Sequence, residues 1–149
     1  MRLTRQSEYA LVGLAFLADR RSGTSVALAE IARACKLPET FLAKIFQKLA
    51  RHGLLAADRG PGHGYSLARD ATAITVREIL EASEGSSLLD TCLFWANHCS
   101  ESDPCPLHYR LKELHPVLES VLDDLTLAGF TADSPNLVNQ SVAGAEEEP

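Results

Sequence analysis

Apolar residues run almost without interruption through residues 9–18, after a mostly polar start. Thr4 is suited to cap a helix at this point, and Glu8 falls in its first turn, where the helix dipole favours an acid. The pattern therefore predicts a helix over residues 3–19. Because this helix is apolar nearly all round, we expect other elements, a neighbouring domain or a second subunit to cover it on more than one side.

Two further helices with narrower apolar faces are predicted at residues 27–35 and 38–52. Pro38 fits the first position of the second helix, and Gly53 fits the position just after its end. Its predicted apolar face consists of Phe41, Leu42, Ile45, Phe46 and Leu49. Two short helices joined by a tight turn, the second one polar and basic on its free side, are typical of a helix-turn-helix.

A β-hairpin is predicted directly after these helices. Residues 54–58 and 65–67 have the character of short strands, and the glycine-rich segment 59–64 lies between them. Glycines allow the tip of such a hairpin to approach a DNA groove closely, and Arg59 can enter the groove. This hairpin is the wing of a winged helix-turn-helix.

The second half begins with a capping box, Thr75 and Glu78, which predicts a helix over residues 76–82. Farther on, apolar residues recur at steps of four and three, which predicts one long helix that pairs with another helix and that Pro116 should kink or split. The heptad positions are Leu107, Leu111, Leu114, Leu118, Val121 and Leu125. We therefore expect a mainly α-helical fold: a winged helix-turn-helix with a small hairpin wing and a long C-terminal dimerisation helix.

The expected organisation has four parts. Residues 1–82 form the DNA-binding domain, 83–108 a cysteine loop, 109–130 the dimerisation helix and 131–149 a disordered acidic tail.

Charge is divided unevenly along the chain. The net charge of −6 combines 11 Lys and Arg against 6 Asp and Glu in residues 1–70, a balance of +5, with 3 against 14 in residues 71–149, a balance of −11. The basic half permits nucleic-acid binding although the whole chain is acidic. The first ten residues lack the pattern of a signal peptide, and the longest apolar run is about half a membrane span, so we expect a cytoplasmic protein without a membrane partner.

Cysteines gather in one short stretch, where Cys92, Cys99 and Cys105 are spaced C-x6-C-x5-C and His108 follows. In the reducing cytoplasm, clustered cysteines indicate metal ligands or redox groups more than disulfides. Three thiolates leave one coordination position for another residue type. An iron–sulphur cluster, a structural zinc or no metal all stay open at this point. Cys35 stands alone and is expected in the core.

Candidate DNA contacts follow from the predicted recognition helix and wing. Residues near the start of that helix usually meet base edges, whereas basic residues elsewhere contact phosphates. The base-edge candidates are Thr40 and Lys44, and the phosphate candidates are Lys48, Arg51 and Arg2. Gln47 is a further candidate on the helix, and the wing candidates are Arg59 and His63.

The order of these features resembles a known family. It consists of the opening MRLTRQSEYAL, the segment LAEIARACKLPETFLAKIFQKLARHGLL, the wing RGPGHGYSLAR, the cysteine loop and a helix ending in LDDLTLAGF. Over roughly residues 1–130 the chain is similar to the bacterial iron–sulphur winged-helix regulators of the IscR and NsrR type. The resemblance implies a homodimeric transcription factor, a repressor, which binds a near-palindromic double-stranded operator with an affinity that depends on its cluster.

The resemblance also implies a set of ligands. Cys92, Cys99 and Cys105 match the cluster cysteines, His108 matches the histidine ligand of IscR-like members, and Glu8 matches a carboxylate that NsrR-like members donate from the partner subunit. The first cysteine gap is one residue longer than in IscR. This leaves open the fourth ligand and the cluster type, with 2Fe–2S favoured over 4Fe–4S.

Other classes of protein remain as alternatives. One is a winged-helix interaction module stabilised by zinc, and another is an iron–sulphur electron-transfer protein. We do not expect an enzyme, because no nucleotide-binding fingerprint or acid–base constellation accompanies the loop.

Overall fold

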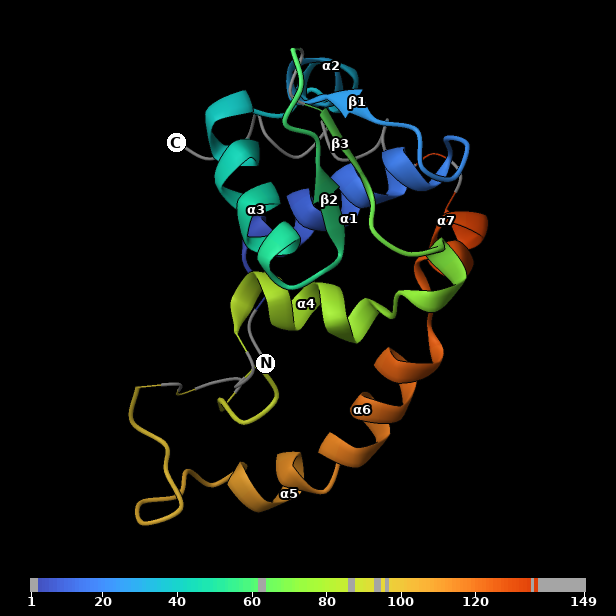
Figure 1. Cartoon of the computed structure of the whole chain (residues 1–149). Helices are drawn as coiled ribbons and strands as arrows, with labels where there is room; N and C mark the ends of the chain where they lie inside the picture. Colours follow the sequence, from blue (N-terminus) through green and yellow to red (C-terminus); the bar gives the residue numbers. More distant parts are fainter. Residues whose placement is uncertain are drawn as a thin grey trace.

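The computed structural model describes residues 3–61, 64–85, 88–92, 95, 97–134 and 136. It is mostly helical, with one small sheet (Figure 1). The elements in chain order are α1 (Arg5–Ala18), β1 (Val26–Ala27), α2 (Leu28–Cys35), α3 (Glu39–Arg51), β2 (Leu55–Ala57), β3 (Gly64–Leu67), the 3-10 helix Ala71–Ala73, α4 (Val76–Glu84), α5 (His108–Lys112), α6 (His115–Asp124) and α7 (Leu127–Asp133).

Helix α1 lies at the centre of the molecule, as its continuous apolar run predicts. It contacts α2, α3, α4, α7 and strand β3, so other elements cover it on several sides. Thr4 caps its start by accepting a hydrogen bond from the backbone N–H of Gln6 at 3.2 Å. Gly13 faces the fully buried Phe46, and a Cβ at this position would lie 2.7 Å from the phenylalanine ring. The absence of a side chain at residue 13 therefore lets α1 and α3 pack closely.

Helices α2 and α3 form the predicted helix-turn-helix. Lys36 turns the chain in the left-handed conformation with φ 54°, and buried Leu37 precedes α3. Pro38 is the N-cap of α3 and not its first helical residue, one position from the prediction. Gly53, with φ 73°, follows the end of α3 as expected.

The wing is a three-stranded antiparallel sheet in the order β1-β3-β2. The hairpin of β2 and β3 was predicted, but the short β1 strand was not. It pairs Val26 with Tyr65 and Ala27 with Gly64. A Cβ at Gly64 would lie 2.2 Å from Ser25 Oγ, so glycine is needed where these two strands approach each other.

Helix α4 opens with the predicted capping box of Thr75 and Glu78 and runs two residues farther than predicted, to Glu84. Glu84 links this end of α4 to the start of α1. Its Oε1 accepts hydrogen bonds from Thr4 N at 2.8 Å, Thr4 Oγ1 at 2.6 Å and Ser7 Oγ at 2.7 Å. Burial would raise the pKa of Glu84, but the hydrogen bonds from Ser7 and Thr4 outweigh it and hold the pKa below its ordinary value.

The C-terminal segment is not one continuous helix: the split expected at Pro116 is present, and a second break at Leu125 was not predicted. The segment is divided into α5, α6 and α7, with Pro116 in the first turn of α6 and Leu125 in an extended conformation. Proline lacks a backbone N–H and its ring clashes with the carbonyl four residues earlier, so α5 cannot continue through it. Thr126 then caps α7, which returns to α1 and buries Leu127 completely.

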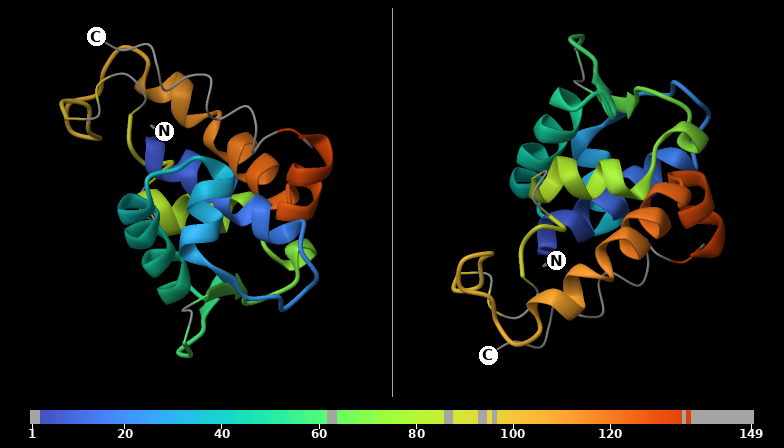
Figure 2. Two further views of the ribbon diagram at one scale, coloured as in Figure 1. Left: turned by 90° about the horizontal axis from the view of Figure 1, so that it is seen from above. Right: turned by 90° about the horizontal axis from the view of Figure 1, so that it is seen from below.

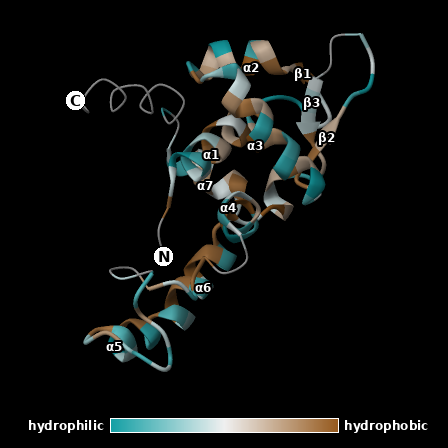
Figure 3. Ribbon diagram, turned by 90° about the vertical axis from the view of Figure 1, so that its left-hand side faces the viewer, coloured by the Kyte–Doolittle hydropathy of each residue, from teal (hydrophilic) through white to brown (hydrophobic). Residues whose placement is uncertain are grey.

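Two parts of the molecule result from this division. We call residues 3–85 together with α7 the head, and residues 88–124 the arm. The wing and the arm lie at opposite ends of the molecule (Figures 1 and 2). Apolar residues continue along α6 in the arm (Figure 3).

The predicted C-terminal tail and the predicted lack of a membrane span concern the last part of the chain and its helices. The predicted tail began at residue 131, but residues 131–133 complete α7, and residues 135 and 137–149 lie outside the described residues. Among the described helices, none combines the length and the apolar character needed to cross a membrane.

Candidate metal centre and DNA interface

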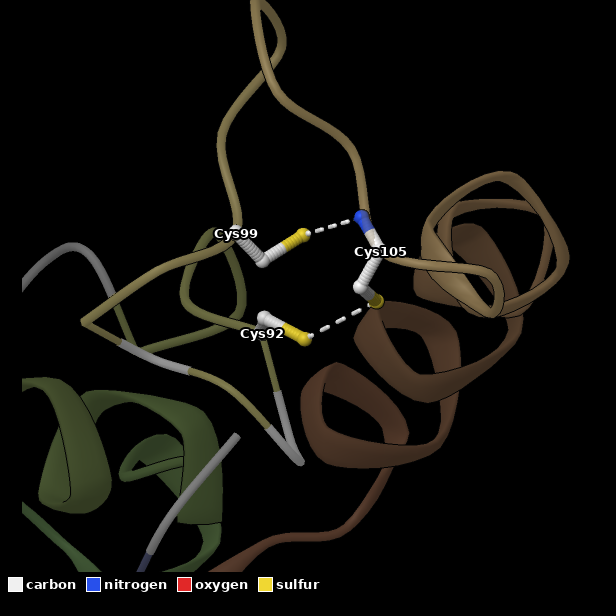
Figure 4. Close-up of side chains that lie close together, drawn as sticks. All are labelled: Cys92, Cys99 and Cys105. Atoms are coloured by element: carbon white, nitrogen blue, oxygen red, sulfur yellow. Dashed lines mark hydrogen bonds between the residues drawn. The ribbon is translucent and has the colours of Figure 1, made fainter.

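The three loop cysteines converge in the arm. The Sγ atoms of Cys92, Cys99 and Cys105 all lie within 4.8 Å of one another, and the three residues are half-buried (Figure 4). The Cys92 and Cys105 sulphurs are 3.8 Å apart, and the backbone N–H of Cys105 donates to Cys99 Sγ at 3.4 Å. Residues that are separated by up to thirteen positions thus offer three soft ligands to one point.

Short turns in the loop bring the cysteines together. The backbone N–H groups of His98 and Cys99 donate to Trp95 O, and the Trp95 N–H donates to Cys92 Sγ at 3.5 Å. A second turn closes between Ser100 and Asp103, whose backbone N–H donates to Ser100 Oγ at 3.0 Å. Trp95 itself is 48% exposed.

The electrostatics around Cys99 favour its neutral thiol in the absence of a metal. The Cys105 N–H would lower the pKa of Cys99, but desolvation and the neighbouring thiols of Cys105 and Cys92 outweigh it and raise the pKa. A cation would reverse this balance, because a coordinating thiol loses its proton. Metal binding here is therefore expected to release protons.

His108, the first residue of α5, lies beside the sulphur of Cys99 and outside the group formed by the three converging sulphurs. Its Nδ1 is 3.2 Å from Cys99 Sγ, and its side chain is only 15% exposed. Its Nε2 is buried and makes no hydrogen bond with the described residues. Three converging thiols, with an imidazole beside the Cys99 thiol, fit both a zinc ion and an iron–sulphur cluster.

The other cysteine and the other candidate ligand lie elsewhere. Cys35 ends α2 and is fully buried in the core, as expected, and burial raises its pKa to about 11. Glu8 is exposed on α1 and does not belong to the group of converging ligands found among the described residues of this chain.

A cavity of about 550 Å3 lies between the cysteine loop and the helices α5 and α6. Cys92, Cys99 and His108 contribute to one wall, and Leu111, Leu114 and Leu118 to the other. The candidate ligands therefore face a space that is bounded by the helices predicted to pair with another subunit.

The candidate DNA contacts divide into two groups on α3. Thr40, Lys44, Gln47 and Arg51 are exposed and recur at helical spacing, so they share one free face. Lys48 is half-buried toward α1, where its Nζ donates to Gln6 Oε1 at 2.8 Å. Arg59 is exposed at the start of the wing tip, whereas Arg2 and His63 lie outside the described residues.

Comparison with known proteins places the chain. A profile of the family Rrf2, described as an iron-dependent transcriptional regulator, matches residues 3–133. The chain belongs to the Rrf2 family.

Named relatives agree with this assignment. The regulator IscR of Yersinia enterocolitica is 33% identical over 128 residues, which cover 86% of this chain and 77% of that protein. IscR of Escherichia coli O1:K1 is 32% identical over 127 residues, covering 85% of this chain and 78% of that protein. Both are named HTH-type transcriptional regulators.

Solved structures show the same fold. IscR of T. potens has a TM-score of 0.69 at 23% identity, covering 100% of this chain and 94% of the other. CymR, the global cysteine regulator of B. subtilis, has a TM-score of 0.70 at 22% identity, covering 89% and 98%. This Rrf2 protein is thus a transcriptional regulator with a DNA-binding winged-helix fold, a class of protein that is not enzymatic.

Two contacts of this Rrf2 protein were missed by sequence reasoning. Gln6 holds Lys48, and nothing in the sequence connects these two residues. Glu101 lies 3.6 Å from His108 Nε2. Its position two residues after Cys99, inside a predicted ligand loop, was a usable signal.

Proposed function

We propose that this protein is a homodimeric repressor whose affinity for its operator depends on an iron–sulphur cluster held by Cys92, Cys99 and Cys105. The observation that carries the proposal is the convergence of these three sulphurs within 4.8 Å in one loop. Relatives named IscR and the family description as iron-dependent support iron over zinc.

His108 is the proposed fourth ligand, through Nδ1. It already lies 3.2 Å from Cys99 Sγ, whereas Glu8 is on α1 and would have to come from the partner subunit. The 2Fe–2S type is favoured, with 4Fe–4S as the alternative. When bound, the cluster would supply a centre that oxidation, nitric oxide or iron scarcity removes or alters.

The proposed partner surface is the exposed apolar side of α6. Leu114, Val117 and Val121 are 53%, 60% and 55% exposed. The opposite side of α6 is already used, because Leu122 and the following Leu125 pack against Val76, Leu80 and Leu88. A second copy of the chain would cover the exposed side, and two recognition helices related by a two-fold axis would read a near-palindromic operator.

A chain of polar contacts connects the stem of the cysteine loop with the recognition helix. Glu84, at the end of α4, holds Thr4 and Ser7 of α1. Gln6, in the same first turn of α1, accepts a hydrogen bond from Lys48 of α3. A change in the loop that displaces Glu84 would therefore be passed to α3, which is the proposed basis of the switch.

The first test is chemical. Anaerobically purified protein should show thiolate-to-iron absorption in the visible spectrum and contain iron and acid-labile sulphide in equal amounts. The stoichiometry per subunit distinguishes the two cluster types. Cys92→Ala should abolish the signal, and Cys35→Ala, which removes a thiol outside the group, should preserve it. Zinc without sulphide would instead favour the interaction module stabilised by zinc.

The second test concerns DNA. A duplex selected from random sequences by the cluster-loaded protein serves as the operator, and affinities of loaded and cluster-free protein are compared at one salt concentration, because phosphate contacts make affinity salt-dependent. Unequal affinities are expected. Equal affinities would rule out the switch, and no DNA binding at low salt would favour the interaction module or the electron-transfer protein.

The third test concerns the dimer. Val117→Asp, which places a charge on the exposed apolar side of α6, should convert the dimer to a monomer in sedimentation.

A further inference from the structure

The imidazole of His108 has one nitrogen directed at the thiols and one directed away from them. Nδ1 is 3.2 Å from Cys99 Sγ. Nε2, on the other side of the ring, is buried and makes no hydrogen bond with the described residues. A buried nitrogen without a partner is costly, so this atom calls for an explanation.

A carboxylate lies next to this second nitrogen. Glu101 Oε1 is 3.6 Å from Nε2, which is within the range of an ion pair but longer than a hydrogen bond. The same oxygen accepts a hydrogen bond from Lys112 Nζ, in the last turn of α5. The turn between Ser100 and Asp103 holds the backbone of Glu101 in place. A small movement of the carboxylate from Lys112 toward His108 would complete a hydrogen bond.

We infer that Glu101 is a positioning residue for His108 as a metal ligand. Coordination through Nδ1 requires the proton of the neutral ring to be on Nε2, and an acceptor at Nε2 fixes both the tautomer and the orientation of the ring. A carboxylate in this place also makes Nδ1 a more basic ligand. Glu101 therefore completes a carboxylate–histidine–metal arrangement, with Lys112 holding the carboxylate in the cluster-free protein.

The competing explanation is an ordinary surface ion pair between Glu101 and Lys112. Their side chains are 69% and 54% exposed, and such pairs have little effect on their surroundings. The two explanations differ in what depends on His108. If the ion pair alone matters, removal of Lys112 and removal of Glu101 should have the same effect on metal binding.

Cobalt is a suitable probe because Co2+ accepts thiolate and imidazole ligands and its visible absorption reports their number and geometry. The full-length protein, freed of metal under anaerobic conditions, is titrated with Co2+ as wild type, Glu101→Ala, Asp103→Ala, Lys112→Met and His108→Ala. Asp103→Ala is the matched control, because it removes a carboxylate from the same turn without facing the imidazole. Melting temperatures of the metal-free variants check that each one folds.

Glu101→Ala should weaken Co2+ binding by about 10- to 100-fold and change the absorption of the bound cobalt. Asp103→Ala and Lys112→Met should bind as the wild type does. In the His108→Ala background, Glu101→Ala should cause no further loss.

Equal losses for Glu101→Ala and Asp103→Ala would overturn the inference, and so would a loss that persists without His108. The inference rests on the proposed function only in that the loop holds a metal through His108. Because cobalt needs no sulphide, normal cobalt results with no iron or sulphide in the purified protein would reject the cluster and keep the role of Glu101. A wild-type protein that binds no cobalt would overturn the inference, whatever its iron content.

Discussion

The head and the arm differ in whether their apolar side chains are buried by the same chain. In the head, Phe46, Leu14 and Ile31 are fully buried by elements of the same chain. In the arm, Val117 and Val121 are more than half exposed although they follow the same helical spacing. The head thus buries its apolar face within one chain, whereas the arm leaves part of its apolar face exposed, as interaction surfaces do.

The polar groups show the same contrast. In the head, Thr4 caps α1 and the capping box of Thr75 and Glu78 opens α4. In the arm, three sulphurs converge, and Nε2 of the neighbouring His108 is buried without a hydrogen bond to the described residues. A buried polar atom without a partner is costly. The arm therefore differs from the head in leaving apolar side chains exposed and one buried nitrogen unpaired among the described residues, and these are the features to which the proposed partner subunit and metal correspond.

The largest expected effect tests the two kinds of apolar residue. Phe46→Ala should lower the free energy of unfolding by about 3–5 kcal/mol, because it leaves a cavity in the core of the head. Urea unfolding should give this loss at every protein concentration. Val121→Ala should weaken association between subunits. Its loss in free energy of unfolding should therefore change when the protein concentration is varied about hundredfold. If the loss for Val121→Ala did not depend on protein concentration, Val121 would not lie at an interface between subunits.

A second difference concerns the cysteines. With a pKa of about 11, native Cys35 is a thiolate in about one molecule in a thousand at pH 8, about a hundredfold less than an ordinary thiol. Iodoacetamide should therefore alkylate Cys35 at least about a hundredfold faster in urea than in the native, metal-free protein, as measured by peptide mass spectrometry. The half-exposed loop cysteines should change much less, and rapid native labelling of Cys35 would place it outside the core.

A smaller effect tests the contact between α4 and α1. Glu84→Gln should destabilise the protein by about 1 kcal/mol at pH 7, a value reduced for partial exposure, because it weakens three hydrogen bonds to a charged acceptor. The folded pKa of Glu84 is lowered, so its stabilisation is complete above the ordinary value of 4.5 and is lost as the pH falls through the folded pKa.

The difference between wild type and Glu84→Gln in urea unfolding should therefore shrink below about pH 4.5. Glu113→Gln, which changes an exposed carboxylate of the arm, is the control and should show no such pH dependence. A Glu84 difference that stays constant down to low pH would contradict the contact.

The smallest expected effect concerns the joint between head and arm. Arg77 of α4 pairs with Glu81 at 2.8 Å, and across to α6 with Asp123 at 3.0 Å and Glu119 at 3.7 Å. Arg77→Met should raise amide exchange in α6 several-fold at low salt and leave exchange in α1 unchanged. Since these pairs are partly exposed, added salt should reduce the difference. Equal changes in both helices would show that the head and the arm open as one unit.

Local signals were sufficient for most of the head. Thr4, the pair Thr75 and Glu78, and Gly53 each mark a helix end by chemistry confined to a few residues, and all were placed correctly. The β1 strand was missed because two residues carry no periodicity. It pairs with β3 where Gly64 allows a close approach, since a Cβ there would lie 3.2 Å from the backbone of Val26.

The C-terminal prediction was correct in expecting a break at Pro116 and missed the second break at Leu125. The heptad steps continue through Pro116 and Leu125, but the chain does not remain helical through them. A repeat of apolar residues predicts which positions are buried, but it does not predict where one helix ends and the next begins. Leu125 packs beside α4, and Leu127, in a new helix, is fully buried in the head core.

The sequence alone determined the winged helix-turn-helix, the basic reading half and the identity of the soft ligands, because caps, turns and periodicity act over a few residues. Tertiary structure alone decided that three sulphurs meet, that His108 turns one nitrogen toward them and the other toward Glu101, and that Gln6 holds Lys48. These contacts depend on how loops close and helices cross. Their geometry is set by the packing of the whole chain and leaves no periodic trace in the residues themselves.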